Sequence, residues 1–175
     1  WAEYESFVDD QMTTGVIDEL GEIRWDLRPA PHLGTLENRV CDGVSTLPEL
    51  AALTALCHCL VVDLDERVAR GEALPVLPPW HVQENKGRAA RYGLDAIVIL
   101  DARSTERLVT DDLADLLVRL EPVAERLGCA AELDSVRDIV ERGASYQRQR
   151  AVAAATDGDL VAVVDSVVRE LRESL

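Results

Sequence analysis

Apolar and polar residues alternate in two different ways in the N-terminal part of the chain. From Trp1 onward, apolar residues recur at near-helical spacing until Gly15 ends the pattern, which predicts a helix. The stretches IRWDLR at 23–28 and TLENRV at 35–40 instead alternate with a period of two, as strands do. The segment PAPHLG between them favours a chain reversal, so we expect the two strands to pair.

A long apolar helix is predicted next. Thr46 and Glu49 form a capping box at its start, and Gly71 closes its far end. The residues from Leu50 to Leu64 are apolar almost all round the helix. The pattern therefore predicts a largely buried helix over residues 47–70.

The rest of the chain is mostly helical. The pattern predicts a helix, a short apolar strand and three further helical segments, at residues 80–93, 94–100, 110–127, 130–143 and 144–175. The last segment is interrupted near Gly158. We expect an α+β fold in which helices dominate, with three or four strands that are too few for a self-sufficient sheet. Because the chain also begins at Trp1 inside a helical pattern, we interpret residues 1–175 as the C-terminal part of one larger domain.

Composition limits the classes of partner. The chain has 18 basic and 33 acidic residues, a net charge of −15, which disfavours binding to nucleic acid or to an anionic membrane face. No uninterrupted apolar run approaches the roughly 18 residues of a membrane span, so we expect no membrane-spanning helix. No export signal opens the sequence either, so we expect a cytoplasmic location. The tract Cys57-His58-Cys59 lies within a predicted helix, where neighbours two apart point away from each other, so we favour packed cysteines over a zinc site.

Charged residues on the two N-terminal strands are the first candidates for chemistry. Residues two apart on a strand point the same way, which aligns Asp26 with Arg28 and Glu37 with Arg39. A carboxylate is a hard ligand for Mg²⁺, and an arginine is a fixed fork for phosphate or carboxylate oxygens. The alternative is a set of solvated cross-strand ion pairs.

Two basic clusters occur later in the chain. Arg88 and Arg91 are three residues apart and share one helical face. Arg148 and Arg150 lie near a predicted helix start, where backbone N–H groups also favour anions. Arginines in an acidic protein commonly serve as solubilising surface residues, so both interpretations remain open at this point.

Three runs in a fixed order resemble a known family. They are IRWDLRPAPHLGTLENRVCDG, LPPWHVQENKGRAARYGLDA and GASYQRQR followed by GDL. The carboxylate–amine ligases of the type-two glutamate–cysteine ligase family show W-D-I/L-R-P-x-P, T-L-E-x-R-x-x-D, E-N-K/R-W-R-A-A-R-Y/H-G-L-D and Q-R-Q-R in this order. The resemblance covers essentially all 175 residues.

The resemblance implies a fold and a reaction. The fold would be similar to glutamine synthetase: an antiparallel sheet, partial in this chain, that forms a funnel and is backed by helices. The reaction would be the ATP-dependent joining of glutamate to the amine of cysteine through an acyl phosphate, with Mg²⁺, or Mn²⁺ in its place. Such chemistry depends on cationic clamps and metal more than on an unusual side chain.

The resemblance also implies roles for individual residues. Glu37 matches the metal-binding glutamate of T-L-E-x-R, and Arg39 beside it would contact the transferred phosphate or a substrate carboxylate. Arg28 is the second implied catalytic arginine, on the strand where Trp25 and Asp26 would line the amino-acid end of the funnel. The later arginines would be substrate contacts or internal ion pairs: Arg88, Arg91, Arg148 and Arg150.

Two departures from the family pattern matter. Gly87 stands where the pattern has tryptophan. The family's N-terminal half, with further metal-ligating glutamates, is missing, so we expect that half to be the chain's partner and the chain alone to be inactive. Open alternatives are a non-catalytic fragment or interaction module, an amine acceptor other than cysteine, and a homodimer.

Overall fold

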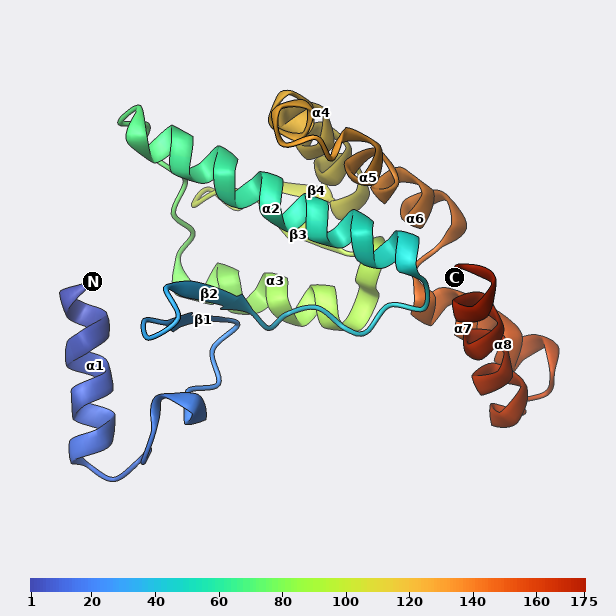
Figure 1. Ribbon diagram of the computed structural model, residues 1–175, viewed down its shortest axis with the longest axis horizontal. Coiled ribbons are helices and arrows are strands. Elements are labelled where there is room, and N and C mark those ends of the chain that lie inside the picture. The colour runs from blue at the N-terminus through green and yellow to red at the C-terminus, as the bar shows by residue number, and fades with distance from the viewer. The chain divides into compact units, whose positions relative to one another are not determined.

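The computed structural model describes residues 1–175, and their contacts divide them into two compact units (Figure 1). Unit 1 is Trp1–Gly43 and unit 2 is Val44–Leu175. The α+β class is confirmed, because helices dominate and the strands form two small antiparallel sheets of two strands each. The assignment of all 175 residues to part of a single catalytic domain stays a prediction.

Unit 1 contains the predicted helix and the predicted strand pair. Its elements are α1 (Ala2–Thr13), a 3₁₀ turn (Leu20–Glu22), β1 (Leu27–Ala30) and β2 (Thr35–Asn38). The first strand lies later than the alternating pattern suggested, at Leu27–Ala30 rather than 23–28, and the second ends at Asn38 rather than Val40. Ile23, expected in the first strand, is instead buried with Val8 and Ile17 in a small apolar cluster. Between the strands, Gly34 has a φ of +64°, in the left-handed region that glycine adopts without strain.

The register of the hairpin determines which side chains meet. Leu27 lies opposite Asn38, and Arg28 lies opposite Glu37. Beyond the end of β2, the backbone N–H of Arg39 donates to the carbonyl of Asp26 at 2.8 Å, so the pairing continues past the strands themselves. The charged residues singled out from the sequence are therefore neighbours across the hairpin.

Unit 2 holds the remaining elements. They are α2 (Leu47–Ala69), α3 (Pro79–Tyr92), a 3₁₀ turn (Gly93–Asp95), β3 (Ile97–Ile99), β4 (Glu106–Leu108), α4 (Val109–Leu127), α5 (Ala130–Asp134), α6 (Val136–Arg142), α7 (Ser145–Ala155) and α8 (Leu160–Glu173). The sequence pattern missed β4, which has only three residues and no apolar run. The helix expected over 130–143 is divided at Ser135 into α5 and α6.

The main core of unit 2 lies between α2 and the helices α4 to α6 (Figure 1). Ala52, Ala55 and Cys59 line the inner face of α2, and their small side chains let α4 approach closely. From α4, Leu120 is the largest fully buried side chain of the chain, and Leu133 of α5 closes the cluster. Helix packing, rather than a sheet, therefore holds unit 2 together.

The prediction that α2 is largely buried is wrong for one of its faces. Its N-cap is as expected, since the Thr46 side chain accepts a hydrogen bond from the Glu49 backbone N–H. However, Leu50, Val61 and Val68 are exposed on the side away from α4. A helix that is apolar all round needs neighbours on every side, and this chain covers only one of them.

The expectation about membrane spans is also corrected. By length and composition α2 could cross a membrane, since an 18-residue window within Leu47–Ala69 has a mean hydropathy of 1.6. Core helices pass the same test, and α2 makes core contacts and ion pairs with α4: Asp63 contacts Arg119 at 3.4 Å and Glu66 contacts Arg126 at 2.5 Å. These contacts favour the interpretation of α2 as a core helix.

Candidate functional site

The hairpin of unit 1 places one carboxylate between two guanidinium groups. Glu37 Oε2 lies 2.6 Å from a terminal nitrogen of Arg28, its partner across the hairpin. Glu37 Oε1 accepts a hydrogen bond at 2.9 Å from Arg39, which is two residues further along on the same side. Arg28 also donates to the carbonyl of Gly21 at 2.5 Å. The three side chains thus form one cluster, which we call the hairpin cluster, as strand alternation predicts.

The hairpin cluster carries two positive charges and one negative charge. Its side chains are only partly covered, with Glu37 41% exposed, so the ion pairs contribute little to folding. A guanidinium has five N–H donors, and the contacts above leave several of them for another acceptor. An arrangement with excess positive charge and spare forked donors suits a phosphate or a carboxylate. The same geometry is also that of a plain cross-strand ion pair, which remains the alternative.

The fit of a divalent cation to this chain is limited. Both oxygens of Glu37 already face arginine nitrogens, and no three His, Cys, Asp or Glu side chains gather anywhere in the chain in a way that could hold a metal. Mg²⁺ commonly takes one or two protein carboxylates together with substrate phosphates. Glu37 could supply one such ligand after exchanging an arginine contact, but the chain does not contain a complete cage.

Trp25 and Asp26 lead into the hairpin cluster from the preceding loop. The Trp25 ring packs against Tyr4 and Phe7 of α1, with centroids 5.7 and 4.9 Å apart. This packing attaches the segment before β1 to α1. Asp26 contributes its backbone carbonyl to the hairpin through Arg39. The substrate-binding roles expected for Trp25 and Asp26 stay predictions.

In unit 2, Arg88 joins α3 to the β3–β4 hairpin. Its guanidinium contacts Glu106 at 2.5 Å and Glu84 at 2.9 Å, and it donates to the carbonyl of Ile97 at 3.0 Å. The hydrogen bond to Glu106, followed by that to Glu84, raises the pKa of Arg88 above its ordinary value. These contacts favour an internal ion pair over a substrate contact for this arginine.

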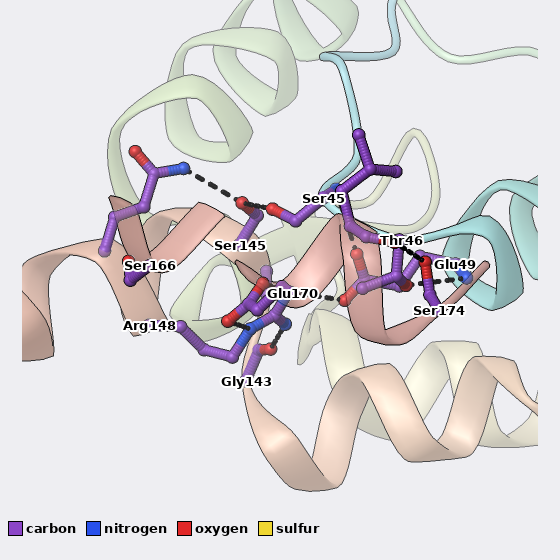
Figure 2. Close-up of polar contacts among 12 residues, drawn as sticks. Ser45, Thr46, Glu49, Gly143, Ser145, Arg148, Ser166, Glu170 and Ser174 are labelled. Carbon is purple, nitrogen blue, oxygen red and sulfur yellow. Dashed lines mark hydrogen bonds and ion pairs between the residues drawn. The ribbon is translucent and has the colours of Figure 1, made fainter. Parts of the chain in front are cut away.

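Arg148 occupies a more enclosed position, where α7 meets α8 and the start of α2 (Figure 2). It makes a two-pronged contact with Glu170, with distances of 3.1 and 3.0 Å, and it lies 2.6 Å from Glu49. It also donates to the carbonyl of Gly143 at 2.5 Å. The Glu170 hydrogen bond is the main cause that raises the pKa of Arg148, and it lowers the pKa of Glu170. These contacts favour an internal ion pair over a substrate contact for Arg148 as well.

Arg91 and Arg150 differ from these two arginines. Both are exposed, and each guanidinium lies over a tyrosine ring, at 5.5 Å from the centroid of Tyr92 and 5.2 Å from that of Tyr146. The Tyr146 hydroxyl donates to the backbone carbonyl of Tyr92 at 3.2 Å, so the end of α3 and the start of α7 meet here. The contact between Tyr146 and Tyr92 therefore joins the two segments that carry the basic clusters, and Arg91 and Arg150 are exposed on them.

The contact between Tyr92 and Tyr146 was not predicted from the sequence, and Gly93 was expected only to end the helix over residues 80–93. Gly93 has a φ of +54°, and a Cβ added there would meet the ring of Tyr146. The only signal in the sequence was that a tyrosine stands close to an arginine in both R-Y-G and S-Y-Q-R. The role of these tyrosines is seen only in the structure, where Tyr146 contacts Tyr92 although the two lie 54 residues apart in the chain.

Comparison with known proteins shows one consistent likeness. The family model described as glutamate–cysteine ligase family 2 matches residues 1–166. A protein of Nocardioides sp. named "Putative glutamate–cysteine ligase 2-3" is 71% identical over 175 residues, which is all of this chain and 46% of that protein. Proteins of Mycobacterium tuberculosis and Mycobacterium ulcerans named "Putative glutamate–cysteine ligase 2" are 70% and 68% identical over 171 residues, covering 46% and 44% of their lengths. The chain thus spans about half the length of the curated relatives it matches.

Proposed function

Because the chain belongs to glutamate–cysteine ligase family 2, we propose that it is the C-terminal half of an ATP-dependent ligase that forms a γ-glutamyl amide. The substrates would be ATP, glutamate and cysteine. The γ-carboxylate of glutamate would attack the terminal phosphorus of ATP and release ADP. The amine of cysteine would then attack the acyl phosphate, so that the amide forms and phosphate leaves.

The hairpin cluster is the observation that carries this proposal. The reaction transfers a phosphoryl group between two anions, so its main requirement is positive charge held in a fixed geometry. Arg39 and Arg28 supply that charge, and Glu37 holds the two guanidinium groups in register. We propose that Arg39 and Arg28 hold the oxygens of the transferred phosphoryl group, while Trp25 and Asp26 border the amino-acid substrate.

The metal and the remaining arginines have supporting roles in the proposal. A Mg²⁺ ion, or Mn²⁺ in its place, would neutralise phosphate charge, with Glu37 as one ligand and the other protein ligands from the N-terminal half. Arg91 and Arg150 are the better candidates for additional substrate contacts, because their donors face solvent. Arg88 and Arg148 would stabilise unit 2 through their ion pairs. Cys59 and Cys129 lie with their sulfur atoms 3.7 Å apart and without a disulfide, which agrees with the cytoplasmic location that we propose.

A chimera provides the direct test. The remainder of the Nocardioides relative, fused to this chain, should release phosphate from ATP only when glutamate and an amine are both present. Cysteine is the expected amine, and turnover with another amine but not with cysteine would identify a different carboxylate–amine ligase. The isolated 175-residue chain should show no turnover. Activity of the isolated chain would contradict its assignment as half of an active site.

Substitutions in the chimera then test the hairpin cluster. Arg39→Gln should lower kcat by about 100- to 1000-fold, the usual effect of losing one donor to a developing oxyanion. The matched control is Glu3→Gln, an exposed change on α1 of the same unit that leaves the hairpin cluster intact. A normal rate for Arg39→Gln would remove the hairpin cluster from the chemistry and leave it as a cross-strand ion pair.

A further inference from the structure

Helix α8 has two faces, and only one of them is used within the chain. The inner face packs on α7 and includes Ser166, which is buried, and Glu170, which holds Arg148. On this side Val163 and Val167 are half-buried. Contacts with α7 therefore cover much of the inner face of α8, and Ser174 at its end accepts a hydrogen bond from the backbone N–H of Leu47.

The outer face is apolar and exposed. Its residues are Val161, Val164, Val168, Leu171 and Leu175. Val161 is 68% exposed and Val164 is 60% exposed, which is unusual for aliphatic side chains on a regular helix. We call these five residues the α8 seam.

The spacing along the α8 seam is that of a helix–helix contact. Successive members are separated by three, four, three and four residues. This alternation places side chains at the a and d positions of a heptad, where they interlock with those of a second helix. Valine and leucine are the residues that such interfaces use. The seam therefore fits an α-helix as its partner, rather than a strand or a small molecule.

We propose that the α8 seam is a self-association surface, on which α8 of one copy packs antiparallel to α8 of a second copy. The position that follows d in a heptad is called e. In an antiparallel pair, the e positions of one helix lie beside the e positions of the other. Here these positions are Asp165 and Arg172, which have opposite charges and are both exposed. Two-fold symmetry would bring Asp165 of each copy beside Arg172 of the other, twice.

A parallel pair would not give this match. Parallel helices bring e positions beside g positions, and the g positions flanking Asp165 and Arg172 are Leu160 and Val167, which carry no charge. The antiparallel arrangement also aligns Val168 with Leu171 of the other copy at the centre of the contact. Charge and apolar registers thus agree on one arrangement of two identical helices.

The same geometry implies a modest affinity. The seam covers about two heptads, whereas isolated helices of this length are marginal in water. Because α7 already holds α8 in helical form, the ordering cost of association is reduced. The net charge of −15 on each copy opposes association, and screening at about 0.15 M salt shortens its range to about 8 Å. We expect a reversible dimer at micromolar to millimolar concentration.

Sedimentation equilibrium of the 175-residue chain tests the proposal at about 0.15 M salt. The average mass should rise with concentration from 19.2 kDa towards twice that value. Val168→Asp should keep the chain monomeric. The control Val76→Asp, at a valine that is 84% exposed outside α8, should leave the association unchanged. Far-UV circular dichroism of each variant shows whether α8 remains helical.

A charge exchange identifies the partner and the arrangement. Asp165→Arg alone and Arg172→Asp alone should each weaken the dimer about tenfold or more, because each replaces two attractive pairs by two repulsive ones. The double variant should recover most of the wild-type affinity. A chain that is monomeric at every concentration would overturn the proposal. A dimer that survives Val168→Asp, or a double variant that does not recover the affinity, would also overturn it. Loss of the association in the full-length chimera would do the same, because it would show that the N-terminal half covers the α8 seam.

Discussion

Replacement of Arg148 by methionine should be among the most damaging single changes in unit 2. The Arg148 side chain is only 14% exposed, and its guanidinium lies between Glu49, which is 7% exposed, and Glu170. Methionine retains the length and apolar stem of the side chain but removes the charge. Two partly buried carboxylates would then face each other without a cation, and the Gly143 carbonyl would lose a donor.

The expected loss of unfolding free energy is about 3–5 kcal/mol, the usual result of removing one partner from a buried ion pair. That is a large share of the about 5–15 kcal/mol that stabilises a typical domain. Urea unfolding followed by helical circular dichroism measures it directly, because most helices belong to unit 2. Arg150→Met is the matched control, since Arg150 is exposed and contacts only a tyrosine ring; its cost should be about 1 kcal/mol or less.

The pH dependence provides an independent check on Arg148. Its hydrogen bond lowers the pKa of Glu170 in the folded state below the ordinary 4.5. The unfolded state therefore binds a proton more readily, so the ion pair stabilises the fold fully above pH 4.5 and loses this effect as the pH falls through the folded pKa. Arg148→Met should remove that part of the acid sensitivity. A loss below about 1 kcal/mol with an unchanged acid profile would refute the structural role of this arginine.

Three further outcomes are expected. Gly87→Ala should stabilise α3 by about 0.5–1 kcal/mol, because open space surrounds the added Cβ. Gly93→Ala should instead destabilise the fold, because the φ of Gly93 is +54° and the ring of Tyr146 occupies the position of the added Cβ. Thermal unfolding of the two variants compares these effects. Thiol labelling should modify the exposed Cys41 first and Cys59 only on unfolding, since burial and a neighbouring thiol raise the pKa of Cys59 to about 11. Labelling of Cys59 as fast as that of Cys41 would contradict the burial of Cys59. In the chimera, Glu37→Gln should lower phosphate release steeply at an unchanged thermal midpoint, with partial rescue by excess Mg²⁺; an unchanged rate would exclude Glu37 as a metal ligand.

Local patterns in the sequence determined most of the secondary structure. The capping box before α2, the period of each longer helix and the hairpin of unit 1 all depend on residues within a few positions of one another. The alternation of β2 was sufficient to align Glu37 with Arg39. The family pattern, which is a feature of the sequence alone, predicted the family that the comparison confirmed.

Only the tertiary structure separated four similar arginines into two kinds. Arg88 and Arg148 are paired with carboxylates that lie 18 and 22 residues away in the chain, and Arg148 also reaches the far more distant Glu49. Arg91 and Arg150 instead meet tyrosines and solvent. Spacing along a helix specifies which side chains share a face, but the partner of that face comes from another part of the chain. For the same reason, the sequence identified α2 as apolar all round, while packing decided that only one of its faces is covered within this chain.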